Sequence, residues 1–297
     1  MENRLNVNIQ RSIYEMQASV KEIDLKRKLY RVLLHGKGLE FDSFRDYGPD
    51  DDSSMIDWKV SKRTQSLLVR RYIEARDLKI LFVIDVSDNM VFGSSPKLKC
   101  EYVAEFCSAL ANLVVVSGNK FGFVLFNGEI KEVRLPERGK KQFDIFTDHI
   151  SRTSTYGGDS NIGNVLDFLI KYIDESVSVV FLVSDFLNVN ESLYNKFSHI
   201  GSKFETISIM VNDILDLKLP DISGEVIIED PQTGEQIVIN PSIAKKNYEQ
   251  NALRKEQSVL EMFRRTSIDN LHLMTTDQFV PKIAEFLKER VNRRTIR

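Results

Sequence analysis

Short apolar runs alternate with amphipathic stretches along the chain after residue 79. The runs KILFVID (79–85), SVVFLVSD (178–185) and FETISIMV (204–211) carry few polar side chains, which is typical of strands buried on both faces. Helical periodicity fills the intervals, for example at 96–116 and 161–174. The pattern predicts an α/β fold: a doubly wound, mostly parallel sheet with helices on both faces.

Two further segments have the pattern of β-hairpins. Residues 120–128 and 130–135 are strand-like runs on either side of Asn127-Gly128, which is a strong turn signal. Residues 225–240 contain two apolar strands around the turn sequence PQTG. We expect both hairpins to be antiparallel additions to the sheet.

The first 78 residues have a different pattern. Residues 9–34 predict one or two amphipathic helices, and a short strand ending near Tyr47 and a second strand at 66–76 follow. We therefore predict two parts: an N-terminal helical and short-strand segment (1–78) that docks on the sheet, and an α/β domain (79–297).

Composition excludes several classes of protein. The 297 residues have a net charge of −2, which gives no global preference for nucleic acid. No run of 18 apolar residues predicts a membrane-spanning helix, and the N-terminus does not have the pattern of a signal peptide. The two cysteines are seven residues apart in a helical segment, too far for an unstrained disulfide. We expect a cytoplasmic protein without membrane insertion.

Polar side chains follow two of the buried strands at the point where each strand ends. Asp85, Ser87 and Asn89 follow the first strand, and Asp185 ends another. Ser160 lies between them in the Gly-rich loop TYGGDSNIG. Because parallel strands end at one edge of a sheet, these oxygens are expected to gather there and to favour Mg²⁺, or alternatively Mn²⁺ or Ca²⁺. The alternative is that Asp and Ser only form local turns.

This set of residues resembles the metal-ion-dependent adhesion site of von Willebrand factor type A domains. Asp85 and Ser87 match the first two residues of that family's Asp-x-Ser-x-Ser loop, and Asn89 occupies the place of its second serine. Ser160 stands where the family has threonine, and Asp185 matches the late aspartate. The resemblance implies a partly degenerate metal site that accepts a carboxylate from another protein.

A series of charged and aromatic residues in the N-terminal part has a recognisable spacing: Glu40, Phe41, Arg45, Tyr47, Asp51, Asp52, Ile56, Asp57, Trp58, Arg63, Glu74 and Arg76. With this series, the chain from about residue 30 onward resembles the domain of unknown function 58 family. The resemblance implies a binding module that acts as an adaptor or accessory factor of a MoxR-type AAA ATPase, in complex assembly or protein maturation.

Two interpretations of that N-terminal series remain open. One is a partner-binding face containing Trp58, Asp57, Arg45 and Arg63, because Trp and Arg are enriched at interface hot spots. The other is a charge-paired platform that docks on the sheet edge next to Asp85 and only supports the fold.

A Mg²⁺-dependent hydrolase acting on a phosphate ester is the alternative function, with Asp85, Asp88, Asp159 and Asp185 around the metal. The loops that carry these residues contain no histidine, lysine or cysteine to act as base or nucleophile, so we do not expect an enzyme. The sequence contains neither GxxxxGK[ST] nor a GxGxxG placed directly after the first strand, which disfavours nucleotide binding.

Overall fold

A six-stranded sheet forms the centre of the computed structural model. The strand order is β10-β7-β6-β3-β4-β5, and all neighbours are parallel except β5, which runs antiparallel to β4. The strands are β3 (Lys79–Asp85), β4 (Lys120–Phe126), β5 (Ile130–Glu137), β6 (Val179–Ser184), β7 (Glu205–Asn212) and β10 (Asp269–Met274). The structure describes residues 4–22, 39–48, 51, 53–74, 78–222, 224–229 and 236–295.

The strand order reverses beside β3. From β3 the chain builds β4 and β5 on one side, and it then returns to place β6, β7 and β10 on the other. In open parallel sheets such a reversal opens a crevice beyond the carboxyl ends of the two central strands, where ligands bind. The carboxyl ends of β3 and β6 carry Asp85 and Asp185, so the topology brings these two residues to that crevice.

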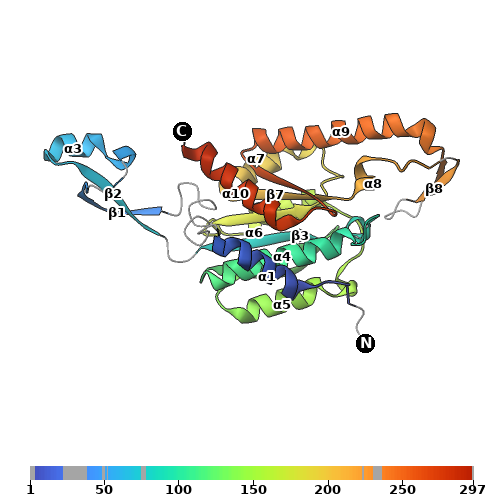
Figure 1. Cartoon of the computed structure of the whole chain (residues 1–297), viewed down its shortest axis with the longest axis horizontal. Helices are drawn as coiled ribbons and strands as arrows, with labels where there is room; N and C mark the ends of the chain where they lie inside the picture. The colour runs from blue at the N-terminus through green and yellow to red at the C-terminus, as the bar shows by residue number, and fades with distance from the viewer. Residues whose placement is uncertain are drawn as a thin grey trace.

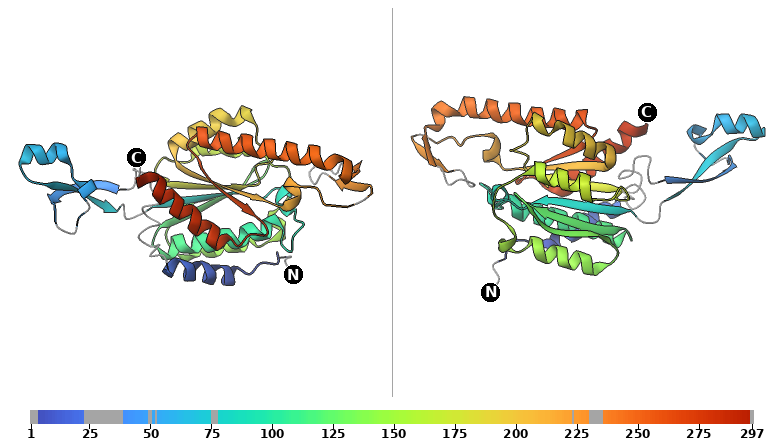
Figure 2. Two further views of the ribbon diagram at one scale, coloured as in Figure 1. Left: turned by 45° about the horizontal axis from the view of Figure 1, so that its top comes forward. Right: turned by 180° about the vertical axis from the view of Figure 1, so that it is seen from behind.

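Helices cover both faces of the sheet (Figures 1 and 2). Alternate residues of each strand enter different cores: Phe82 packs with helices on one face, and its neighbour Val83 packs with helices on the other. The predicted fold class is therefore confirmed. The first face carries α1 (Ile9–Glu22), α4 (Lys99–Val116), α5 (Lys140–Ile150) and α10 (Phe279–Thr295); the second carries α6 (Ile162–Tyr172), α7 (Tyr194–Lys203) and α9 (Pro241–Arg265).

The second predicted hairpin forms β8 (Val226–Glu229) and β9 (Gln236–Ile239), which pair antiparallel as a separate two-stranded sheet. It follows the short helix α8 (Ile214–Leu217) and precedes α9. Only the hairpin centred on Asn127-Gly128 extends the main sheet, so the expectation that both hairpins join it is wrong for β8–β9.

The N-terminal segment occupies two places. Helix α1 packs on α4 through residues that include the buried Met16. Strands β1 (Leu39–Asp46) and β2 (Leu68–Glu74) form an antiparallel pair with α3 (Trp58–Thr64) between them. Figure 1 shows this β1–β2–α3 unit at one end of the molecule, beyond the start of β3.

The position of the β1–β2–α3 unit corrects one expectation. Strand β2 ends shortly before β3 begins, whereas Asp85 lies at the far end of β3. The unit therefore does not lie beside Asp85. Docking of this unit on the sheet stays a prediction, because residues 23–38 and 75–77, which join it to the rest of the chain, lie outside the described residues.

Candidate functional site

Asp85 is a fully buried carboxylate on which three parts of the chain converge. Its Oδ1 accepts a hydrogen bond from the backbone N of Ser87 at 2.9 Å. Its Oδ2 accepts from Ser160 Oγ at 2.9 Å and from Ser184 Oγ at 2.7 Å. The loop after β3, the Gly-rich loop before α6 and the end of β6 therefore meet at one carboxylate, at the crevice that the topology defines.

The loop after β3 carries the other predicted ligands. Ser87 is fully buried, and its Oγ makes no hydrogen bond of ordinary geometry with the described residues, although the side chain lies close enough to Asp85 to work against the rise that burial causes in the pKa of that carboxyl. Asn89 follows in a single 3-10 turn and is half-buried. Asp88 accepts a hydrogen bond from Gly158 N at 2.9 Å, which fixes the loop against the Gly-rich segment. The unpartnered Ser87 oxygen is the feature of this loop that local turns do not explain.

A lysine that the sequence analysis missed also lies at this edge. Lys99, the first residue of α4, places its Nζ 2.8 Å from Asp185 Oδ2 and 3.1 Å from Asp216 Oδ2. The three side chains are at most 7% exposed. A signal was present in the sequence, because a positive charge at the start of a helix opposes the helix dipole and needs another reason to be there.

The charges at this edge do not balance. Burial and the charge of Asp185 raise the pKa of Asp85. Burial lowers the pKa of Lys99, but Asp185 and Asp216 outweigh that effect and the pKa is raised. Burial also raises the pKa of Asp216. When all are ionised, three carboxylates face one ammonium group, and a divalent cation would neutralise the remaining charge.

The donor set fits Mg²⁺ in type and charge. Asp85, the free oxygen of Ser87 and the hydroxyl of Ser160 are hard oxygen ligands, and Mg²⁺ accepts few protein ligands while it keeps several waters. Asp185 is less available, because Lys99 binds its Oδ2 and Leu187 N donates to its Oδ1 at 3.1 Å. Among the described residues no three His, Cys, Asp or Glu side chains form a metal-binding group. A metal ion bound at this edge would therefore need the serine hydroxyls as ligands in addition to the carboxylates.

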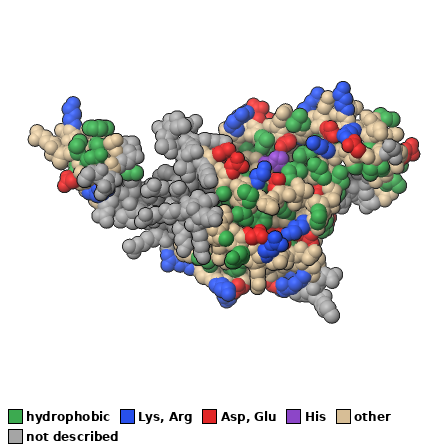
Figure 3. All heavy atoms as spheres, viewed as in Figure 1, with side chains coloured by type: hydrophobic (Ala, Val, Ile, Leu, Met, Phe, Trp, Pro, Cys, Tyr) green, Lys and Arg blue, Asp and Glu red, His purple; other side chains and the backbone are tan. Residues whose placement is uncertain are grey.

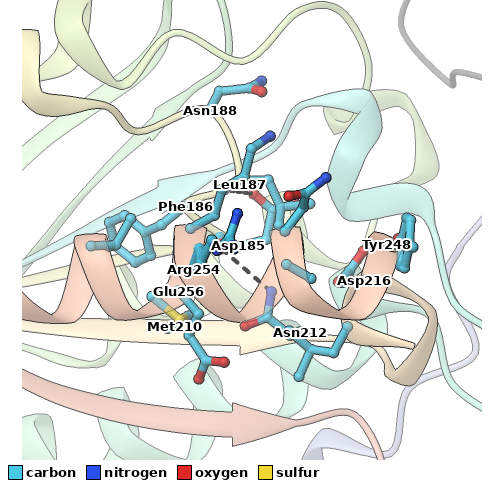
Figure 4. Close-up of a pocket in the computed structure, with 15 residues that line it drawn as sticks. Asp185, Phe186, Leu187, Asn188, Met210, Asn212, Asp216, Tyr248, Arg254 and Glu256 are labelled. Atoms are coloured by element: carbon cyan, nitrogen blue, oxygen red, sulfur yellow. Dashed lines mark hydrogen bonds between the residues drawn. The ribbon is translucent and has the colours of Figure 1, made fainter. Parts of the chain in front are cut away.

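A cavity of about 530 Å³ lies beside Asp185, between the loop after β6 and α9 (Figure 4). Asn212 lies in its wall and donates from Nδ2 to the backbone oxygen of Asp185 at 3.4 Å, while the Oδ1 of Asn212 has no partner among the described residues. Arg254 and Glu256 of α9 also line it. Of the predicted metal ligands only Asp185 lines this cavity, so the cavity lies beside the site and not over Asp85.

The four residues predicted to bind a partner differ in their surroundings. Trp58 and Arg63 are exposed on α3. Asp57 is buried and caps α3 by accepting from the backbone N of the next turn at 3.1 Å. Arg45 pairs with Asp51, and this pair lowers the pKa of Asp51 to about 2. Trp58 and Arg63 are free to meet a partner, whereas Asp57 and Arg45 hold the local structure.

Comparisons with solved structures return proteins of low sequence identity. BatB from Bacteroides thetaiotaomicron, a conserved hypothetical protein, is 13% identical with a TM-score of 0.44, and the match covers 72% of this chain and 99% of that one. The SpRpn10 VWA domain is 12% identical with a TM-score of 0.37, over 72% and 93% of the two chains. The strand order and the covering helices described above are those of a von Willebrand type A-like α/β fold. Within the described residues no helix has the length and apolar character needed to cross a membrane.

Comparisons of sequence give the family. Uncharacterized proteins of Mycobacterium bovis and Mycobacterium tuberculosis are 26% identical over 281 residues, which is 91% of this chain and 87% of theirs. The model of the family described as "Protein of unknown function DUF58" matches residues 43–258. The chain therefore belongs to the DUF58 family.

Proposed function

We propose that this chain is a non-enzymatic, metal-dependent protein-binding module whose metal site lies at the Asp85 edge of the sheet. The observation that carries the proposal is the buried Ser87 Oγ, which forms no ordinary hydrogen bond and lies at an edge where Lys99 does not balance the charge of three carboxylates. Bound Mg²⁺, or Mn²⁺ or Ca²⁺ in its place, supplies a coordination position for a carboxylate of another protein.

Each residue at the edge then has a distinct task. Asp85 and the hydroxyls of Ser87 and Ser160 hold the cation. Asp185, fixed by Lys99, adds negative charge without using its bonded oxygen. Asn89 is half-buried in the same loop, and we assign its side chain to the cation or to the partner.

We further propose that the partner is a MoxR-type AAA ATPase in the cytoplasm, and that the chain serves it as an adaptor in complex assembly or protein maturation. Membership of the DUF58 family supports this proposal through the resemblance described above. The chain lacks a GxxxxGK[ST] loop, so ATP chemistry is left to the partner. Trp58 and Arg63 offer a second contact, at the other end of the strands.

Thermal unfolding with added Mg²⁺ tests the metal site. A ligand that binds only the native state raises the melting temperature, so wild type is expected to shift and Asp85→Asn is not. Asp167→Asn is the matched control, because Asp167 is an exposed carboxylate that pairs with Lys196 away from the edge. No shift of wild type at about 10 mM Mg²⁺ overturns the metal dependence, because a native-state ligand at a concentration well above its Kd must stabilise the protein.

A pull-down with the purified ATPase tests the partner. Binding is expected in Mg²⁺, weakened by EDTA, and weakened again by Asp85→Asn or Trp58→Ala. Tyr14→Ala removes an exposed aromatic side chain of α1 and serves as the control. Binding that is unchanged by EDTA and by both substitutions contradicts the proposal.

A further inference from the structure

The β8–β9 hairpin has uncovered apolar side chains on both faces. Ile227 and Val238 are partners in the register and share one face, whereas Ile237 is next to Val238 in the strand and points to the other. All three side chains are between 61% and 65% exposed. An isolated two-stranded hairpin is marginally stable in water unless something covers a face. These apolar residues therefore indicate a surface that is covered in use.

The hairpin segment is also acidic. Residues 219–244 contain five Asp or Glu residues and no Lys or Arg. Glu225 is exposed at its described start, whereas Asp221 is paired with Lys245 of α9. Two acidic β8–β9 hairpins would repel each other, so a second hairpin is not the expected binding partner of the first. The occupant that fits is both apolar and basic.

This chain carries such a surface on α3. Met55, Trp58 and Leu67 are between 49% and 66% exposed. Residues 58–73 contain five Lys or Arg residues and no Asp or Glu, and the basic side chains of α3 are exposed. We call the exposed set the α3 face; it consists of Met55, Trp58, Lys59, Lys62, Arg63 and Leu67.

Two of the described acidic residues near the α3 face are already engaged in other contacts. Asp51 is paired with Arg45, and Asp57 is buried as the cap of α3. Trp58 adds the kind of large rigid side chain that dominates interface energies. The α3 face and the hairpin are therefore complementary in both charge and apolar character.

The two surfaces lie at opposite ends of the molecule (Figure 1), and Figure 3 shows hydrophobic side chains at each end. They therefore do not cover one another within one chain. We infer that the α3 face of one copy docks on the β8–β9 hairpin of a second copy. This head-to-tail contact closes into a ring or extends as a chain, depending on the rotation between copies.

The self-contact is separate from the metal site. It needs neither the cation nor an ATPase, so it stands if the proposed function fails. Both contacts use Trp58, so on one copy they exclude each other. In an open assembly the terminal copy keeps a free α3 face.

Light scattering after gel filtration tests the contact with paired variants. The α3 variant is Trp58→Ser with Lys62→Glu, and the hairpin variant is Ile237→Ser with Val238→Ser. Wild type is expected to exceed its 34.2 kDa monomer mass as concentration rises, and each variant to weaken association about tenfold or more. Tyr14→Ser is the control, because Tyr14 is 74% exposed but lies on neither surface.

Light scattering of a mixture of the two variants is the most direct test of the head-to-tail contact. The α3 variant keeps an intact hairpin, and the hairpin variant keeps an intact α3 face, so an equal mixture is expected to form a species of twice the chain mass. A wild type that stays monomeric at about 100 µM, a concentration that detects weak association, overturns the inference. Equal association of wild type and both variants, or a mixture that stays monomeric, also overturns it. Unchanged melting temperatures show that the exposed substitutions leave the fold intact.

Discussion

Lys99 Nζ lies 2.8 Å from Asp185 Oδ2, and both side chains are almost completely buried. Asp216 shares the same ammonium group. Lys99→Met leaves two buried carboxylates without their cation, and removal of one partner of a buried pair costs about 3–5 kcal/mol of unfolding free energy. Urea denaturation of wild type and Lys99→Met measures this loss.

Two further variants separate charge from packing. Lys99→Met with Asp216→Asn removes one of the stranded charges, so it is expected to recover part of the lost stability. Lys196→Met removes the partner of Asp167 in an exposed pair, where the loss is at most about 1 kcal/mol. If Lys99→Met is as mild as Lys196→Met, the buried cluster does not depend on its ammonium group.

Asp85→Asn is expected to stabilise the metal-free protein at neutral pH. The native pKa of Asp85 is raised, so the native state holds its proton more tightly than the unfolded state does. The contribution of Asp85 is therefore fully present below its unfolded pKa and lost as pH rises through the native pKa. The amide side chain of the Asp85→Asn variant does not ionise, so this contribution to stability is not lost as the pH rises. Its oxygen still accepts from Ser87 N, and its NH₂ group donates to the Ser160 and Ser184 hydroxyls, which can also accept.

Urea denaturation in EDTA at several pH values checks this prediction. The advantage of Asp85→Asn over wild type is expected at pH 7 and shrinks as the pH falls toward about 4, the unfolded pKa of aspartate. With Mg²⁺ present the order is expected to reverse, because only wild type gains from the cation. An Asp85→Asn protein that is less stable than wild type at pH 7 in EDTA contradicts the raised pKa as the dominant effect.

The gathering of Asp85, Ser160 and the end of β6 follows from sequence order alone. Parallel strands end at one edge, so two strand-terminal aspartates and a Gly-rich loop between them are enough to predict the meeting point. The apolar strand sequences also predicted a sheet that is covered on both faces, because near-continuous apolar runs leave no face for solvent.

Lys99 and Asp216 were beyond this reasoning. Lys99 reaches the edge with a long side chain from the start of α4, and Asp216 comes from the short helix α8. The position of Lys99 at a helix start was a local sign of an unusual role, but its meeting with Asp216 depends on how these elements pack. The position of the β1–β2–α3 unit was missed for a related reason: opposite charges in the sequence suggested docking beside Asp85, but Arg45 and Asp51 pair within the unit.

Ser87→Ala separates metal binding from stability. Because Ser87 Oγ has no hydrogen-bond partner among the described residues, its removal strands no donor or acceptor. Without metal the change in unfolding free energy is expected to stay within about 0.5–1 kcal/mol. The Mg²⁺-induced rise in melting temperature is expected to shrink or vanish. Ser184→Ala is the matched control, because it removes a hydroxyl that does bind Asp85 and so destabilises the metal-free protein. A full Mg²⁺ shift in Ser87→Ala excludes its hydroxyl as a ligand.

Asp213 fixes the segment that leads from the Asp85 loop to Lys99. This fully buried carboxylate accepts from Ser94 N at 2.9 Å, from Leu215 N at 3.0 Å and from Thr275 Oγ1 at 3.0 Å. Burial raises its pKa, but these hydrogen bonds outweigh burial and the pKa is lowered. Its contribution to stability is therefore present above the unfolded pKa and lost as the pH falls through the native pKa.

Asp213→Ala is expected to cost about 1–3 kcal/mol at pH 7, because it removes the acceptor of donors from three elements, one of which, the Thr275 hydroxyl, is buried. The difference from wild type narrows in strong acid, where the wild-type carboxylate is protonated. Asp174→Ala is the control: Asp174 also has a lowered pKa from a local hydrogen bond, here with Ser176, but it is exposed, so its removal changes stability far less. Urea denaturation between pH 3 and pH 7 makes the comparison. An Asp213→Ala protein whose stability and Mg²⁺ shift both match wild type shows that Lys99 and the Asp85 loop are positioned without this carboxylate.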